Sequence, residues 1–174
     1  MEVRIIKFPK DDDWAFVFQC AVVTVGKDIK NHVPSMHWKH DILKAKHSPI
    51  RTLQFAFEIT DLPYWVSTHL VRHVHAQPFV RSQRNDRQND YDRTKAPQDA
   101  PVNMIWYMNA EELITIAQKR LCKQASVETQ EVVRRIVELV EAECPEFKGL
   151  LAPTCERYGC CDEIKPCGRL NKND

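Results

Sequence analysis

Residues 53–76, LQFAFEITDLPYWVSTHLVRHVHA, decide the fold, because the hydrophobic period changes within this one segment from that of a strand to that of a helix. Apolar side chains occupy every second position over Leu53–Ile59, as in a strand with one buried face. The following residues offer capping oxygens and a proline suited to a first helical turn. The segment therefore predicts a strand followed directly by a helix over Pro63–Ala76.

Shorter apolar runs before this segment predict further elements. Residues Glu2–Phe8 alternate like a strand before a proline stops the run. The run Trp14–Val25 fits either a strand or a buried helix, and the pattern leaves both open. Ser35 can cap a helix that continues to Ala45, and His47-Ser48-Pro49 ends it because the residue before proline avoids helical angles.

The second half of the chain predicts one strand and two helices. Met104–Met108 has the composition of a short strand. Asn109 can cap a helix that ends near Cys122, and Ser126 can cap another that continues to Glu143. Strands and amphipathic helices follow one another without a repeat, so the sequence predicts an α+β fold.

The composition limits which classes of partner we expect for the protein. A chain of 174 residues with 43% hydrophobic residues fits one compact domain. Its formal net charge of +1 supplies no general field toward nucleic acid or an anionic membrane, so we expect neither partner. No apolar run approaches membrane length, and the N-terminus MEVRIIKFPKDDDW lacks a secretory core, so we expect a cytoplasmic protein.

The cysteines divide the chain into a domain over residues 1–150 and a cysteine-rich tail over residues 151–174. The chain has seven cysteines, and in a reducing compartment an odd count favours free thiols or a metal site over a disulfide framework. Thiolates are zinc ligands, so the tail could wrap one ion. Unpaired surface thiols are the alternative. The candidate zinc ligands are Cys155, Cys160, Cys161 and Cys167.

The densest polar segment is His69–Arg93, HLVRHVHAQPFVRSQRNDRQNDYDR, with three histidines and five arginines. Guanidinium groups that converge on one point bind phosphate well. Residues Gln77–Pro101 show little periodicity, and a long polar loop inside a compact domain usually binds a ligand. A solvated loop with scattered ion pairs is the alternative.

Parts of this segment resemble the motif of the flavin-dependent thymidylate synthases. That family carries Arg-His-Arg, a short spacer, and then Asn-Glu-x-Ser-x-Arg, and here Arg72-His73 and Ser82-x-Arg84 fall at the matching separation. Upstream, His47-Ser48-Pro49 before an alternating strand is similar to the family's His-x-Ser-Pro segment. Downstream matches in register are Arg93-x3-Pro97, Asn109-Ala110-x2-Leu113, Arg120 and Gln124-Ala125-x2-Glu128. The resemblance runs from about Cys20 to Phe147.

The resemblance implies a single domain with a mixed or antiparallel sheet and packed helices, assembled into a homotetramer. It also implies reductive methylation of dUMP to dTMP, with FAD as cofactor, methylenetetrahydrofolate as carbon donor and NADPH as reductant. Carried over by position, Arg84, Arg93 and Arg120 would hold the phosphate and uracil carbonyls of the nucleotide, and Ser82 would contact the nucleotide.

The same resemblance implies the groups around the flavin. Arg72 and His73 would face the flavin and, with Arg120, would form the catalytic set. His47 and Asn109 would add further cofactor contacts. Since the flavin carries the one-carbon unit and the hydride, these side chains would mainly position and polarise.

Three positions depart from the family pattern: the second arginine of Arg-His-Arg is Val74, the Asn-Glu pair is Phe79-Val80, and the glutamine before the motif is His69. These changes keep a second interpretation open, in which a diverged relative binds or modifies a pyrimidine nucleotide without folate-dependent methyl transfer. A third interpretation, a zinc or RNA-binding module, conflicts with the near-neutral charge.

Overall fold

One antiparallel sheet organises the computed structural model, which describes residues 1–84, 92 and 94–170. Within these residues the strand order is β1-β2-β4-β3. The strands are β1 (Glu2–Lys7), β2 (Gln54–Pro63), β3 (Ala76–Val80) and β4 (Pro101–Asn109). The pairing of β2 with β4, from Gln54 opposite Asn109 to Pro63 opposite Pro101, forms the centre of the sheet.

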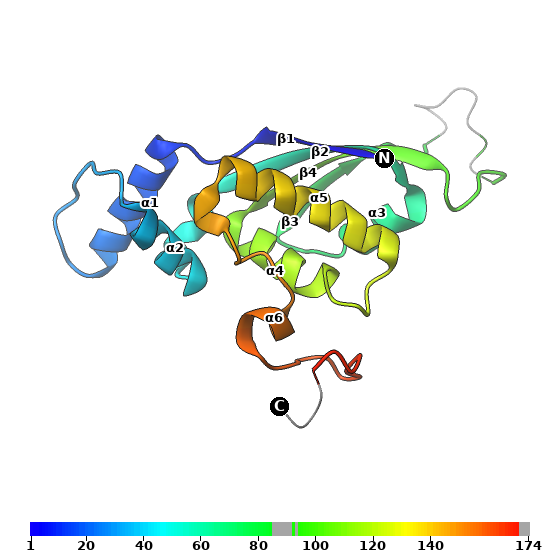
Figure 1. Ribbon diagram of the computed structural model, residues 1–174. Helices are drawn as coiled ribbons and strands as arrows, with labels where there is room; N and C mark the ends of the chain where they lie inside the picture. The colour runs from blue at the N-terminus through cyan, green and yellow to red at the C-terminus, as the bar shows by residue number, and fades with distance from the viewer. Residues whose placement is uncertain (85–91, 93, 171–174) are drawn as a thin grey trace.

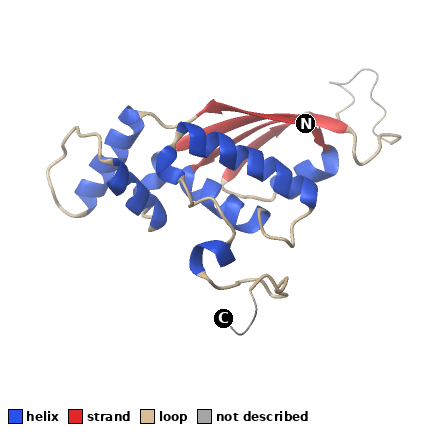
Figure 2. Cartoon of the chain, in the orientation of Figure 1, coloured by secondary structure: helices blue, strands red, loops and turns tan. Residues whose placement is uncertain are grey.

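Helices cover one face of this sheet, as Figures 1 and 2 show. Three of them lie beneath the strands: α3 (Tyr64–Leu70), α4 (Ala110–Arg120) and α5 (Val127–Glu143). Two more form one end of the molecule: α1 (Asp11–Thr24) and α2 (Met36–Lys44). The remaining helical turns are η1 (Ser48–Thr52), η3 (Pro145–Phe147) and α6 (Thr154–Tyr158).

The expected α+β fold is confirmed, and α1 settles the open assignment of residues 14–25 as a helix. No helix in the described part of the chain is long and apolar enough to cross a membrane.

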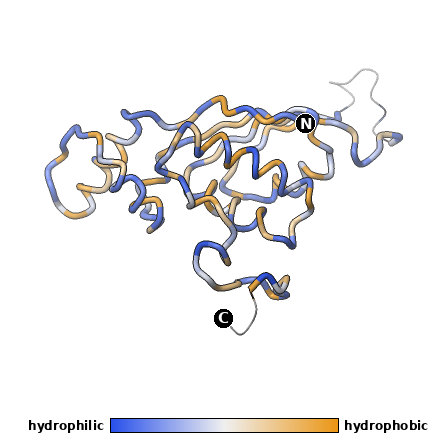
Figure 3. Tube along the Cα trace, in the orientation of Figure 1, coloured by the Kyte–Doolittle hydropathy of each residue, from blue (hydrophilic) through white to orange (hydrophobic). Residues whose placement is uncertain are grey.

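The core lies between the sheet and these helices, and apolar residues recur along both layers (Figure 3). The alternation in β2 is confirmed, because Phe55, Phe57 and Ile59 are fully buried. Trp106 on β4 is also fully buried, and its indole N–H has no hydrogen-bond partner among the described residues. Because fully buried aromatic side chains contribute most to core stability, this layer fixes the helices against the sheet.

The three predicted capping residues begin their helices as expected. The Ser35 hydroxyl accepts from the Trp38 backbone N–H at 3.3 Å. The Asn109 side chain accepts from the Glu112 backbone N–H at 2.9 Å, which starts α4 directly where β4 ends. Ser126 starts α5 in the same way. These caps occupy donors that a helix cannot satisfy internally.

The sequence prediction was wrong about residues 71–80. The helix expected to reach Ala76 ends at Leu70, and residues 76–80 form strand β3 where a loop was expected. Pairing with β4, from Ala76 opposite Met108 to Val80 opposite Met104, stabilises this strand. That partner is distant in sequence, so local periodicity could not indicate it. Pro78 fits because β3 lies at the edge of the sheet.

Candidate functional site

His73 connects the turn after α3 with both ends of α4. It lies in the turn between α3 and β3, held by hydrogen bonds from its N–H to Leu70 O at 3.2 Å and from Ala76 N–H to its own carbonyl at 3.1 Å. Its Nδ1 lies 3.2 Å from Glu112 Oε1, and Arg120 Nε donates to its Nε2 at 2.8 Å. The first and last turns of α4 therefore meet on one imidazole.

Arg120 is the half-buried cation of this cluster. Its Nη2 donates to the backbone carbonyl of His69 at 2.8 Å, so the guanidinium is held at two points. Burial, and then the nearby charge of Arg72, lower the pKa of the Arg120 guanidinium. Two cations close together, one of them half-buried, favour an anionic ligand that would relieve their repulsion.

The other predicted nucleotide contacts lie away from His73. Ser82 follows β3 and is about 20 Å along the chain from Ala76, at roughly 3.3 Å per strand residue. The Ser82 hydroxyl accepts from the Arg84 backbone N–H at 3.3 Å. Arg93 lies outside the described residues. The structure therefore brings Arg72, His73 and Arg120 together but not Ser82 and Arg84 with them.

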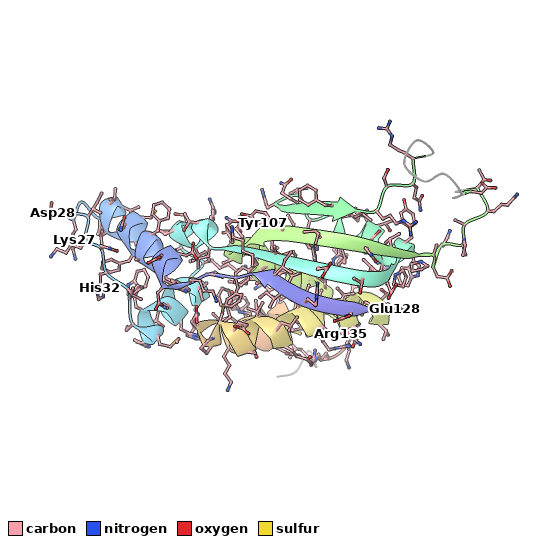
Figure 4. All side chains as sticks on the ribbon, turned by 90° about the horizontal axis from the view of Figure 1, so that it is seen from above. Lys27, Asp28, His32, Tyr107, Glu128 and Arg135 are labelled. Atoms are coloured by element: carbon pink, nitrogen blue, oxygen red, sulfur yellow. The ribbon has the colours of Figure 1, made fainter. Side chains whose placement is uncertain are left out.

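The two remaining predicted cofactor contacts lie elsewhere. Asn109 is at the opposite end of α4 from Arg120, and its side-chain oxygen is used for the helix cap. His47 is exposed and lines a groove of about 860 Å³ between α1, α2 and the loop that joins them. Figure 4 shows Lys27 and Asp28 of that loop at the outer end of the molecule.

The groove is lined by apolar residues and by charged residues of both signs. Its apolar lining includes Phe18, Val22 and Trp38, and the Phe18 and Trp38 rings lie 5.5 Å apart in an edge arrangement. Its charged lining residues are Lys27, Lys30, Asp28 and Asp41. An aromatic ring system suits the apolar part of this lining, and a phosphate suits the lysines. These residues were not predicted as functional, because they come from separate segments of the chain and form no sequence motif.

Glu112 is the other residue that the sequence prediction missed. Its side chain is buried, with a carboxylate against His73. A glutamate three residues after a helix cap usually serves the helix itself, so its sequence position gave no signal for this contact. The contact depends on the turn after α3, which the sequence prediction placed inside a helix.

The zinc interpretation of the tail is not supported. In residues 1–84, 92 and 94–170 no three His, Cys, Asp or Glu side chains are grouped to hold a metal ion. Cys160, Cys161 and Cys167 are exposed free thiols, while Cys155 is half-buried in α6. Tetrahedral zinc needs donors converging at about 2.3 Å, which this arrangement does not provide.

Solved structures with a similar fold identify the fold type of this chain. Two structures of the flavin-dependent thymidylate synthase ThyX from Helicobacter pylori, both complexed with FAD and dUMP, match with TM-scores of 0.66 and 0.68 at 15% sequence identity. The matches cover 82% and 87% of this chain and 95% and 99% of those chains. The family model described as thymidylate synthase complementing protein matches residues 86–146. The family match covers 61 of the 174 residues, and at 15% identity the structural likeness shows the fold alone. No curated protein matches the chain.

The structural matches therefore cover nearly the whole length of those two chains. The family match covers a shorter segment, which begins after β3 and ends near η3. It includes Arg93, Asn109 and Arg120, three of the residues singled out by the motif resemblance. It leaves out Arg72 and His73, which the structure adds through their contacts with α4.

Proposed function

We propose that the chain is a flavin-dependent thymidylate synthase that converts dUMP to dTMP, with methylenetetrahydrofolate as carbon donor and NADPH as reductant. The observation that supports this most is the convergence of Arg72, His73 and Arg120 in a chain with the ThyX fold. Arg72 and His73 are neighbours in the motif segment, whereas Arg120 lies 47 residues from His73 along the chain.

The arginines would bind the nucleotide. Arg120 is pre-organised by its bonds to His73 and His69, so it loses little side-chain entropy when it binds a uracil carbonyl or phosphate. Arg72 adds a second cation beside it. Ser82, Arg84 and Arg93 are proposed as further nucleotide contacts, on the resemblance of their motif.

FAD fits the groove beside His47. The apolar lining with Phe18 and Trp38 suits the rings of the cofactor, and Lys27 and Lys30 suit its phosphates. Bound there, FAD would supply the hydride and carry the one-carbon unit. The chain's own residues would exclude water from the rings, and Arg72 and His73 would polarise the reacting end. Asn109 is proposed as a further contact near the cofactor.

The proposed enzyme is a homotetramer with active sites between subunits. The His47 groove lies between α1 and α2, at one end of the molecule, whereas Ser82 and Arg84 follow β3 and His73 contacts α4. One chain does not gather these groups around one ligand. Sites at subunit contacts, where one copy supplies the groove and another the arginines, would complete the constellation, as the family resemblance implies.

A diverged relative that binds a pyrimidine nucleotide without folate-dependent transfer is the second candidate. Val74 is 81% exposed and Phe79 is 65% exposed, so the positions that differ from the motif present apolar groups at the surface. Such groups cannot replace the charged contacts of the motif.

The test is dTMP formation by the purified chain supplied with FAD, dUMP, methylenetetrahydrofolate and NADPH, followed by chromatography. Product that requires all four additions supports the synthase. If the protein binds FAD and dUMP but forms no dTMP, the second candidate replaces it. If it binds neither, both fail.

A further inference from the structure

Glu112 has a buried carboxylate. The residue is 6% exposed in the first turn of α4, and the side chains of Glu112 and His73 are 7% and 10% exposed. Burying a carboxylate is costly unless it is paired and hydrogen-bonded. Its side-chain partner among the described residues is His73 Nδ1, at 3.2 Å.

Arg120 fixes which nitrogen of His73 carries the proton. A guanidinium N–H can only donate, so His73 Nε2, which receives Arg120 Nε–H at 2.8 Å, has to be the acceptor. The proton of the neutral ring is then on Nδ1, where it points to Glu112. One direction of donation therefore runs from Arg120 through His73 to Glu112.

Removing the Glu112 carboxylate would disturb the hydrogen bond between His73 and Arg120. Without Glu112, the Nδ1–H would be a buried donor with no acceptor, which favours moving the proton to Nε2. An Nε2–H would face the Nε–H of Arg120, and two donors cannot bond. The guanidinium would then keep only its bond to the His69 carbonyl and could turn about it.

The orientation of the Arg120 guanidinium matters because, among the described residues, one of its nitrogens is free to bind a ligand. Within the described part of the chain, Nε is bonded to His73 and Nη2 to His69, while Nη1 has no hydrogen bond. Fixing two corners of a planar guanidinium fixes the direction of the third. The direction of Nη1 is thus set by His73 and by whatever holds His73.

We propose that Glu112 is a positioning residue that, through the tautomer of His73, aims Arg120 at the uracil nucleotide. The inference rests on the proposed function in taking dUMP as the ligand. Its structural half, the control of His73 and Arg120, stands on the apo protein alone. Glu112 acts only through the other two residues.

The experiment uses the full chain labelled with ¹⁵N in histidine and arginine. NMR reports the tautomer of His73 and the Nε–H signal of Arg120, and calorimetry reports the affinity for dUMP. The variants are Glu112→Leu, which removes the acceptor, and Glu112→Gln, whose amide oxygen can still accept from Nδ1–H. Glu111→Gln is the matched control, because that neighbouring carboxylate pairs with Arg51 instead.

We expect wild type, Glu111→Gln and Glu112→Gln to show His73 protonated on Nδ1 and a protected Arg120 Nε–H. Glu112→Leu should lose both signatures and bind dUMP about tenfold more weakly, the loss of roughly one hydrogen bond to a charged group. Rescue by Gln distinguishes positioning from a general need for charge.

Wild-type His73 protonated on Nε2 would overturn the inference even if Glu112→Leu fails to fold. So would a Glu112→Leu protein that keeps the Arg120 signal and wild-type dUMP affinity. A wild-type protein that shows the expected tautomer but binds no dUMP would refute the proposed function while supporting the structural half of the inference.

Discussion

Replacing Arg120 with alanine should weaken nucleotide binding while leaving the fold almost unchanged. Arg120 is half-buried next to Arg72, and both conditions lower the pKa of its guanidinium, so the folded protein holds this charge at a cost. Its two hydrogen bonds, to His73 Nε2 and His69 O, offset part of that cost. We therefore expect the free energy of unfolding to change by less than about 1 kcal/mol.

The loss in binding should be much larger. A hydrogen bond to a charged group contributes about 1.5 to 3 kcal/mol, which corresponds to about 10- to 150-fold in the dissociation constant for dUMP. Calorimetry on the FAD-loaded protein measures this directly. Thermal unfolding of the same samples separates binding from stability.

Arg135 offers a matched control for this experiment. It is also a partly buried helix arginine, with its Nε bonded to Glu131 and its Nη1 bonded to the Met1 carbonyl at 2.7 Å. It lies on α5, and neither of its two partners is a predicted site residue. Arg135→Ala should leave dUMP affinity unchanged. Unchanged affinity in Arg120→Ala, or equal losses in both variants, would refute the assignment of Arg120.

Three further predictions concern the groove, the core and a buried thiol. The double variant Lys27→Ala/Lys30→Ala should weaken FAD binding about tenfold, more at low salt, and Lys148→Ala should not; equal FAD affinity in a fluorescence titration would remove the cofactor from this groove. Phe57→Ala should destabilise the fold by about 3 to 5 kcal/mol in urea unfolding, because the ring is fully buried, and a loss below about 1 kcal/mol would contradict this packing. Burial raises the pKa of the Cys144 thiol to about 12, so the folded state keeps a proton that the unfolded state releases from about pH 9. The thiol's contribution should therefore be complete below pH 9 and lost toward pH 12, and the difference in melting temperature between wild type and Cys144→Ala should shrink over that range; a constant difference would contradict it.

The sequence was most informative where a segment's own pattern determines its structure. The β2 alternation and the caps Ser35, Asn109 and Ser126 depend on neighbouring residues alone, and the structure confirms them. Strand β3 depends on a partner more than twenty residues away in sequence, and Pro78 and the polar residues that follow the strand concealed it. Trp14–Val25 could not be assigned because a short apolar run fits either state.

The candidate site shows the same division. The motif resemblance singled out Arg72, His73 and Arg120, which the structure brings together. It could not indicate Glu112, whose role depends on the turn that aims His73 at α4. The tail cysteines are close in sequence, but proximity along a chain does not impose convergence of their side chains in space.

A dUMP titration of the FAD-reconstituted protein, followed by visible absorbance, shows whether one protein holds a flavin and a uracil nucleotide together. We expect FAD to remain bound through gel filtration and its absorbance bands to shift saturably with dUMP, with the midpoint moved to higher dUMP concentration in Arg120→Ala. FAD that separates from the protein, or a flavin spectrum that dUMP leaves unchanged, would show that the protein does not hold the two ligands together.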